Sequence, residues 1–196
     1  MRELVLASRN RKKLDELQAL LEPLGFRLRL VSEFTDEAAE EPAPTFIENA
    51  LLKARHAAQV SGLPAIADDS GIEVDALLGA PGVHSARYAG PQADDAANNK
   101  KLLQALADKP SRERGASYAC VLAYLRHPAD PVPVIAEGRW RGRILEAPRG
   151  ARGFGYDPLF WVEEHGKSAA ELEPAVKNRL SHRARAAARL LELLRG

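Results

Sequence analysis

The stretch Glu3-Leu-Val-Leu-Ala7, the triplet Ser8-Arg9-Asn10 and the segment from Arg11 to Leu24 together decide the fold class. The first five residues predict a short buried strand, and the polar triplet predicts a turn. Leucines then recur at helical spacing and predict a helix with one apolar face, formed by Leu14, Leu17, Leu20, Leu21 and Leu24. A strand, a turn and a helix in this order open an α/β fold.

The rest of the chain continues this alternation. Further strands are predicted at about 26–31, 63–67, 72–74, 116–125, 133–140, near 144 and at 159–162, and helices at about 46–60, 94–107 and 177–194. An acidic segment, 33–41, predicts a loop, and Thr45-Phe-Ile-Glu48 predicts a capping box at a helix start. Because no linker or repeat divides the chain, residues 1–196 are expected to form a single domain.

Composition and charge exclude several classes of protein. The 196 residues are enough to bury a core without disulfides, and the net charge of +1 gives no long-range field for a nucleic acid. Cys120 stands alone in an apolar run, which predicts core packing and a reducing compartment. No stretch approaches the ~20 apolar residues of a membrane span. We therefore expect a cytoplasmic protein that binds neither nucleic acid nor a membrane.

The first candidate site is the turn before the first helix. A helix N-terminus offers free amides and the positive end of the helix dipole, so it can hold an anion. Ser8 and Asn10 can donate to that anion, and the segment also supplies the basic residues Arg9, Arg11, Lys12 and Lys13. The alternative is that Ser8 or Asn10 only caps the helix while the cations face water.

The second candidate site is the pair Asp68-Asp69, expected at the carboxyl end of a strand. Adjacent strand residues point to opposite faces, so only one carboxylate should face a bound cation. Mg²⁺ prefers oxygen ligands and is held by one or two carboxylates plus substrate phosphates; Glu40 or Glu41 can supply the second carboxylate. The alternative for Asp68-Asp69-Ser70-Gly71 is an ordinary turn. Lys53 lies in a polar helical stripe, which a solvated helix face also explains.

Two further candidates lie near the end of the chain. In Gly153-Phe-Gly-Tyr-Asp-Pro158 the glycines allow close approach of a ligand, Phe154 offers a stacking face, and Asp157 can accept hydrogen bonds from a base or ribose. A tight aromatic turn is the alternative. Lys177 and Ser181-His182-Arg183 carry donors suited to a carbonyl oxygen such as the 6-oxo group of a purine, although a basic, solvated helix explains them too.

In their order, these segments resemble one family, the inosine and xanthosine triphosphate pyrophosphatases that cleanse nucleotide pools. The resemblance covers nearly the whole chain. It rests on separate blocks: Ser8-x-Asn10-x-x-Lys13, Thr45-Phe-Ile-Glu-Asn-Ala50, Lys53-Ala-Arg55, Ala67-Asp-Asp-Ser-Gly71, Gly79-Ala-Pro-Gly82, Ser85-Ala-Arg-Tyr88, Gly153-Phe-Gly-Tyr-Asp-Pro158 and Ser181-His-Arg183.

The resemblance implies a fold and an activity. The fold is an elongated, two-lobed α/β structure with a long mixed central sheet flanked by helices and an active cleft between the lobes, usually in a homodimer. The activity is Mg²⁺-dependent hydrolysis of deaminated purine nucleoside triphosphates (ITP, dITP and XTP) to monophosphate and pyrophosphate. A nucleotide with an amine at position 6 would leave buried donors unpaired, at about 1 to 3 kcal/mol each.

The resemblance also implies roles for single residues. The triphosphate would be held by Ser8, Asn10, Lys13 and Lys53. Asp69 would be the general base and a metal-side carboxylate, with Asp68 close by, and Glu41, or Glu40 in its place, would complete the metal site. The substrate would be contacted by Ser70, its base and sugar enclosed by Phe154, Gly155, Tyr156 and Asp157, and its 6-oxo edge read by Lys177, His182 and Arg183. Some relatives carry Thr and Gly where this chain has Ser8 and Arg9, so Arg9 either binds phosphate or faces water.

Three other readings stay open at this point. A related enzyme could hydrolyse pyrimidine or other modified nucleotides, which a panel of triphosphates would reveal. A nucleic-acid-binding module could use the basic C-terminal helix; the near-neutral charge and the acidic loop weigh against it, and steep salt-dependent binding would support it. A nucleotide sensor would bind without turnover.

Overall fold

The computed structural model describes residues 2–195, which form two compact units. Of the described residues, the first unit comprises 2–69, Cys120–Gly138 and 182–195, and the second comprises Ser70–Ala119 and Arg139–Ser181. Three long strands pass from one unit into the other. No helix among the described residues is both long enough and apolar enough to cross a lipid bilayer.

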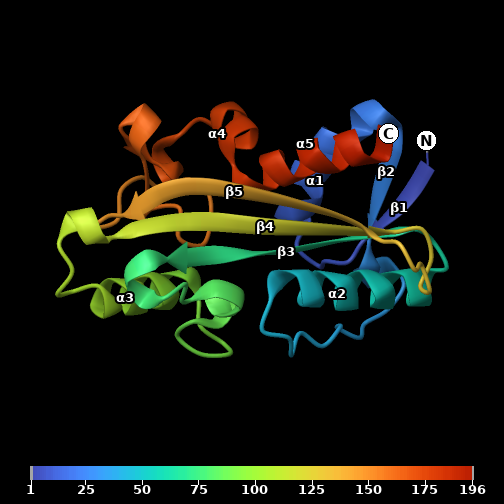
Figure 1. The fold of residues 1–196 in the computed structure, drawn as a ribbon, viewed down its shortest axis with the longest axis horizontal. Helices are drawn as coiled ribbons and strands as arrows, with labels where there is room; N and C mark the ends of the chain where they lie inside the picture. The colour runs from blue at the N-terminus through green and yellow to red at the C-terminus, as the bar shows by residue number, and fades with distance from the viewer. Residues whose placement is uncertain (1, 196) are drawn as a thin grey trace. The chain divides into compact units, whose positions relative to one another are not determined.

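The strands form one mixed sheet in the order β2-β1-β3-β4-β5-β6-β7 (Figure 1). Their bounds are β1 Arg2–Leu6, β2 Phe26–Leu30, β3 Ala65–Val74, β4 Gly115–Leu125, β5 Val134–Ile144, β6 Phe160–Val162 and β7 Lys167–Ser168. β1 pairs in parallel with β2 and β3, whereas β6 pairs antiparallel with β5 and β7. The predicted α/β class, with a mixed central sheet flanked by helices, is confirmed; the cleft between lobes stays a prediction.

In the first unit, helices cover both faces of the sheet. α1 (Arg11–Leu21) and α5 (His182–Arg195) lie on one face, and α2 (Phe46–Ser61) lies on the other (Figure 1). The predicted apolar face of α1 is buried against the strands and α5 through Leu14, Leu17 and Leu21. α2 instead presents alanines to the sheet. The sheet therefore has two chemically separate faces in this unit.

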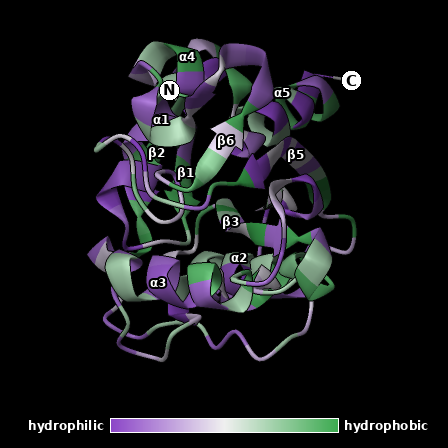
Figure 2. Ribbon diagram, turned by 90° about the vertical axis from the view of Figure 1, so that its left-hand side faces the viewer, coloured by the Kyte–Doolittle hydropathy of each residue, from purple (hydrophilic) through white to green (hydrophobic). Residues whose placement is uncertain are grey.

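The second unit has its own core. α3 (Asp95–Ala105) contributes Leu102, and β3 to β6 contribute a cluster in which the ring centres of Tyr118 and Phe160 are 4.6 Å apart. α4 (Pro174–Leu180) is short and begins with a proline at its first position. Helices α2 and α3 carry both hydrophilic and hydrophobic residues, as helices with one buried face do (Figure 2).

Several sequence-based boundaries were wrong. Asp68-Asp69-Ser70-Gly71 does not end a strand or form a turn, because β3 runs through all four residues. The strands expected at 133–140 and near 144 are one strand, β5. The first helix ends at Leu21, where a 3₁₀ turn containing a proline follows. The predicted last helix is two helices, because Ser181 adopts an extended backbone (ψ 155°) between α4 and α5.

Candidate active site

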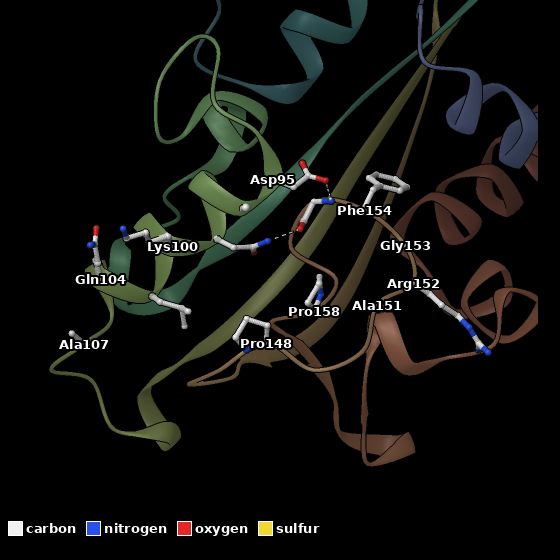
Figure 3. A pocket seen from close by; sticks show the side chains of 14 residues that line it. Asp95, Lys100, Gln104, Ala107, Pro148, Ala151, Arg152, Gly153, Phe154 and Pro158 are labelled. Atoms are coloured by element: carbon white, nitrogen blue, oxygen red, sulfur yellow. Dashed lines mark hydrogen bonds between the residues drawn. The ribbon is translucent and has the colours of Figure 1, made fainter.

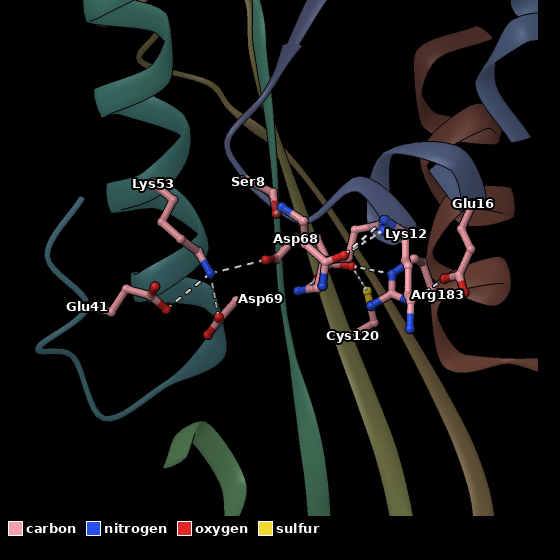
Figure 4. Close-up of polar contacts among 11 residues, drawn as sticks. Ser8, Lys12, Glu16, Glu41, Lys53, Asp68, Asp69, Cys120 and Arg183 are labelled. Carbon is pink, nitrogen blue, oxygen red and sulfur yellow. Dashed lines mark hydrogen bonds and ion pairs between the residues drawn. The ribbon is translucent and has the colours of Figure 1, made fainter. Parts of the chain in front are cut away.

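Strand β3 places two neighbouring aspartates on opposite faces of the sheet. Asp68 faces α1 and α5, where Lys13 and Arg183 bind it, and Asp69 faces α2, where Lys53 binds it (Figure 4). This is the alternation expected of successive strand residues. The two carboxylates therefore belong to separate polar clusters.

The Asp68 cluster is a buried ion network. The Asp68 side chain is 0% exposed; Lys13 Nζ lies 2.5 Å from Oδ1 and Arg183 Nε lies 2.7 Å from Oδ2. Arg183 also donates through Nη1 to Glu16 at 2.5 Å, and the Cys120 Sγ is 3.4 Å from Asp68 Oδ2. Burial acts to raise the pKa of Asp68, but the positive charges of Arg183 and Lys13 outweigh it and hold that pKa well below its usual range.

In the Asp69 cluster, Lys53 is the cation that binds the carboxylate directly. Lys53 Nζ donates to Asp69 Oδ1 at 2.6 Å, to the backbone oxygen of Asp68 at 3.1 Å and to Glu41 Oε2 at 3.2 Å. Burial raises the pKa of Asp69, and the charge of Lys53 does not cancel this effect. Burial acts to lower the pKa of Lys53, but the negative charge of Asp69 outweighs it and the pKa is raised. A partly buried carboxylate with a raised pKa is suited to accept a proton.

The turn before α1 is organised by its own side chains. Asn10 Oδ1 accepts from the backbone N–H of Lys12 at 2.9 Å and of Lys13 at 3.3 Å, and Ser8 Oγ accepts from the N–H of Asn10 at 3.1 Å. Asn10 is thus the N-cap of α1, as the alternative interpretation of this segment expected. The turn nevertheless places Lys13 beside Asp68, so this segment and β3 meet.

The two arginines of this segment point elsewhere. Arg9 donates to the backbone oxygen of Asp36 in the acidic loop. Arg11 forms an exposed pair with Asp15 at 3.4 Å. Exposed pairs of this kind contribute little to stability. Phosphate binding by Arg9, Arg11 and Lys12 stays a prediction.

The donor set beside Lys53 fits a magnesium ion. The carboxylates of Glu41 and Asp69 both accept hydrogen bonds from Lys53 Nζ. The space beside these two carboxylates therefore favours a positive charge. Across residues 2–195 no three His, Cys, Asp or Glu side chains gather as a metal-binding group. Mg²⁺ needs only one or two carboxylates when waters and phosphates complete its shell. Both glutamates are exposed, but the Glu41 carboxylate contacts Lys53, so Glu41 is the better placed of the two candidates.

In the second unit, Asp157 organises the glycine-rich loop 153–157. Its Oδ2 accepts from the backbone N–H of Phe154 at 2.9 Å and from Lys177 Nζ at 2.6 Å, and Tyr118 donates to its Oδ1 at 3.4 Å. Lys177 Nζ lies 4.8 Å from the centre of the Phe154 ring. Gly153 has a φ of +80°, a left-handed conformation that favours glycine. The Phe154 ring, the Lys177 ammonium and the buried Asp157 carboxylate thus lie close together.

The structure places the predicted residues in two groups. The first unit holds Ser8, Arg9, Asn10, Arg11, Lys12, Lys13, Glu40, Glu41, Lys53, Asp68, Asp69, His182 and Arg183, and the second holds Ser70, Phe154, Gly155, Tyr156, Asp157 and Lys177. His182 and Arg183 are both buried at the start of α5. Because two nitrogens of Arg183 bind carboxylates, its reading of a 6-oxo edge stays a prediction.

Sequence reasoning missed three residues of these clusters. Glu16 binds Arg183 across 167 positions, Tyr118 binds Asp157, and Cys120 contacts Asp68 as well as packing in the core. Helical spacing alone would place Glu16 one turn beyond Lys12 and Lys13, but nothing local indicates its partner. The predicted core packing of Cys120 is confirmed.

The fold and the clusters on β3 define an α/β protein whose lysines and carboxylates are suited to a polyanion and a divalent cation. The chain belongs to the Ham1 family, whose model matches residues 4–193. It is 58% identical to a protein of Pseudomonas aeruginosa named dITP/XTP pyrophosphatase, over 99% of this chain and 98% of that one. The solved structure of a HAM1 protein from Coxiella burnetii is similar, with a TM-score of 0.93, 49% identity and coverage of 100% of this chain and 99% of that chain. The Staphylococcus aureus Ham1 protein matches with a TM-score of 0.89 and 38% identity over the same shares.

Proposed function

We propose that this chain is a nucleoside-triphosphate pyrophosphatase that hydrolyses deaminated purine nucleoside triphosphates (ITP, dITP and XTP) to the monophosphate and pyrophosphate. The observation that carries the proposal is the meeting, on β3, of Lys13 and Lys53 with the carboxylates of Asp68 and Asp69. Several relatives of 52 to 60% identity carry the name dITP/XTP pyrophosphatase.

Triphosphate binding falls to the first unit in this proposal. A triphosphate carries several negative charges, so an attacking water is repelled unless cations neutralise them. Lys13 lies in the first turn of α1, and Lys53 lies beside Asp69. The Ser8 hydroxyl supplies a neutral donor. When the nucleotide binds, Lys13 shares its charge between Asp68 and the phosphates.

The two aspartates have different tasks in this proposal. Asp69 takes a proton from the attacking water, because its raised pKa suits a general base and its side chain, at 11% exposed, is still open to solvent. Asp68 is fully buried between Lys13 and Arg183, so it holds α1 and α5 in place. Lys53 positions the Asp69 carboxylate and screens it from Glu41.

Glu41 and Asp69 are the residues that would hold Mg²⁺, with Glu40 as a nearby alternative. The ion, when bound, supplies positive charge to the phosphates and lowers the pKa of water. Lys53, which contacts both carboxylates, would add its own positive charge toward the phosphates. This arrangement uses only side chains that already face one point in the structure.

Base recognition falls to the loop 153–157 and to the residues after it. The Phe154 ring offers a stacking face, and Asp157 and Lys177 present an acceptor and a donor next to it. The family resemblance also assigns His182 and Arg183, which belong to the first unit, to the 6-oxo edge. An adenine would leave such donors unpaired in a desolvated pocket.

Pyrophosphate release from a panel of nucleotides tests the proposal. Purified protein is supplied with ITP, dITP, XTP, ATP, GTP and pyrimidine triphosphates, each with and without Mg²⁺. We expect rapid release from the first three, slower release from ATP by at least about tenfold, and none without the metal. Equal rates for all nucleotides, or no cleavage of ITP, would contradict it.

Two further predictions belong to the same proposal. A homodimer is inferred from the family resemblance, and light scattering of the eluting protein would reveal a mass twice the 21.4 kDa of the chain. The cytoplasm is inferred as the place where nucleotide pools are met. A monomer that hydrolyses ITP at full rate would contradict the predicted homodimer and leave the proposed chemistry unchanged.

A further inference from the structure

Helix α3 forms hydrogen bonds to the middle of the loop 153–157 through two side chains. Asp95 Oδ2 accepts from the backbone N–H of Gly155 at 2.7 Å, and Asn99 Nδ2 donates to the backbone oxygen of Gly155 at 2.9 Å (Figure 3). Asp95 and Asn99 are four residues apart, so they lie on one side of the helix. The two bonds fix both peptide groups that flank Gly155.

Packing alone does not hold this part of the loop. A pocket of about 700 Å³ separates α3 from the segment 148–158, and both line it (Figure 3). A methyl group added at Gly155 would meet nothing within 4 Å. On the side of the pocket, no close-packed neighbours restrict the backbone of Gly155. Its position there depends on directional hydrogen bonds.

α3 is itself tied to the segment that supports the other side of the loop. Asn98 Oδ1 accepts from the N–H of Ala89 at 2.8 Å, and its Nδ2 donates to the oxygen of Ala86 at 3.2 Å. The Tyr156 hydroxyl donates to the backbone oxygen of Ser85 at 2.7 Å. The residues 85–89, α3 and the loop therefore form one connected frame within the second unit.

We propose that Asp95 and Asn99 are positioning residues for the purine base, acting through Gly155 on the neighbouring ring of Phe154. The inference rests on the proposed function, because that function gives Phe154 its role. Neither side chain contacts the base in this account. They hold the peptide groups on each side of Gly155, so the Phe154 ring is presented before the substrate arrives, and binding need not order the loop.

Kinetics of single variants test this inference. Asp95→Ala should raise the KM for ITP about tenfold and change kcat by less than about twofold, since a hydrogen bond to a charged group is lost and the bond serves binding of the base. Asn99→Ala should raise KM by a smaller factor, about threefold, because its bond is between neutral groups. Asp95→Asn keeps an oxygen acceptor and should restore most of the affinity.

The matched control is Asp94→Ala. Asp94 is the N-cap of α3, accepting from the N–H of Ala97 at 2.7 Å, and within residues 2–195 it makes no hydrogen bond to the loop. Its loss should lower the thermal midpoint at least as much as Asp95→Ala while leaving KM unchanged. Equal rises in KM for Asp94→Ala and Asp95→Ala would overturn the inference, because general loosening of α3 would then explain both.

Hydrogen exchange provides a readout that does not need turnover. The Gly155 amide should exchange at least about tenfold faster in Asp95→Ala than in the wild type, and at the wild-type rate in Asp94→Ala. Unchanged protection of Gly155 in Asp95→Ala overturns the inference even if ITP is hydrolysed. If the wild-type protein leaves ITP uncut but the exchange rates are as expected, the proposed function and the role in base binding are refuted. The result would still show that Asp95 holds the loop 153–157.

Discussion

Asp68 and Asp69 are neighbours in sequence, yet the two faces of β3 give them opposite chemistry. Burial acts on both carboxylates in the same direction and raises their pKa. Asp68 is bound by two cations, Lys13 and Arg183, which reverse the shift, whereas Asp69 is bound by Lys53, meets the negative charge of Glu41, and has Lys13 only as a more distant positive charge. The number of cations on each face therefore decides which carboxylate remains an ion pair and which is suited to accept a proton.

Removal of the divalent ion should affect only the Asp69 face, and it has the largest expected effect. Chelation should lower pyrophosphate release from ITP by about a thousandfold, since the phosphate charge is no longer neutralised. The thermal midpoint should hardly change, because Lys53 contacts both Glu41 and Asp69 and neutralises part of their charge without the ion. A large fall in midpoint on chelation would show that the metal supports the fold and would break the comparison.

Truncation of Asp68 should affect the opposite face through stability. Asp68→Ala leaves Lys13 and Arg183 without their buried counter-ion, and breaking such a pair costs about 3 kcal/mol. Urea unfolding, monitored by circular dichroism, measures this loss. The matched Asp15→Ala variant removes only an exposed pair with Arg11 and should change the free energy of unfolding by less than about 1 kcal/mol.

The stability that Asp68 contributes should depend on pH. Because its pKa is lower in the folded chain than in the unfolded chain, the contribution is present above the unfolded pKa and is lost as the pH falls through the folded pKa. The difference in unfolding free energy between wild type and Asp68→Asn should therefore be greatest near neutral pH and shrink in acid. A difference that grows on acidification would mean that the carboxylate is not held as an ion.

Substitution of the helix N-caps should have the smallest effects on stability. The two caps belong to helices on opposite faces of the sheet, so they allow the faces to be compared. Asn10 caps α1, which carries Lys13, and Thr45 caps α2, which carries Lys53. Asn10→Ala and Thr45→Ala should each lower the free energy of unfolding by about 1 kcal/mol. A much greater loss of activity in Asn10→Ala than in Thr45→Ala would indicate that Asn10 also binds phosphate.

Local patterns predicted the elements well where local chemistry decides them. Thr45 does cap α2 by accepting from the N–H of Glu48, and the leucines of α1 do face the core. The stretch Asp68-Asp69-Ser70-Gly71 was misjudged because its residues favour turns, while pairing with neighbouring strands kept it extended. Strand geometry alone still predicted that the side chains of Asp68 and Asp69 point to opposite faces of the sheet.

Long-range pairing is what the sequence could not supply. Arg183 was expected to face a ligand, but its position against Asp68 and Glu16 depends on how α5 packs beside α1. Likewise, Asp95 and Asn99 showed no motif, because their partner is a backbone group about 60 residues away. Burial and charge at these points follow from tertiary contacts, which spacing along one chain does not encode.

The most direct test of the account compares Asp69→Asn with Asp68→Asn in a single pyrophosphate-release assay with ITP and Mg²⁺, below the thermal midpoint of each variant. We predict that Asp69→Asn retains its midpoint and nucleotide binding but loses at least about a hundredfold in kcat, the loss expected for a missing general base. Asp68→Asn should have a lower thermal midpoint than the wild type but keep most of its kcat. The opposite pattern, with Asp69→Asn active and Asp68→Asn stable but inactive, would contradict the account.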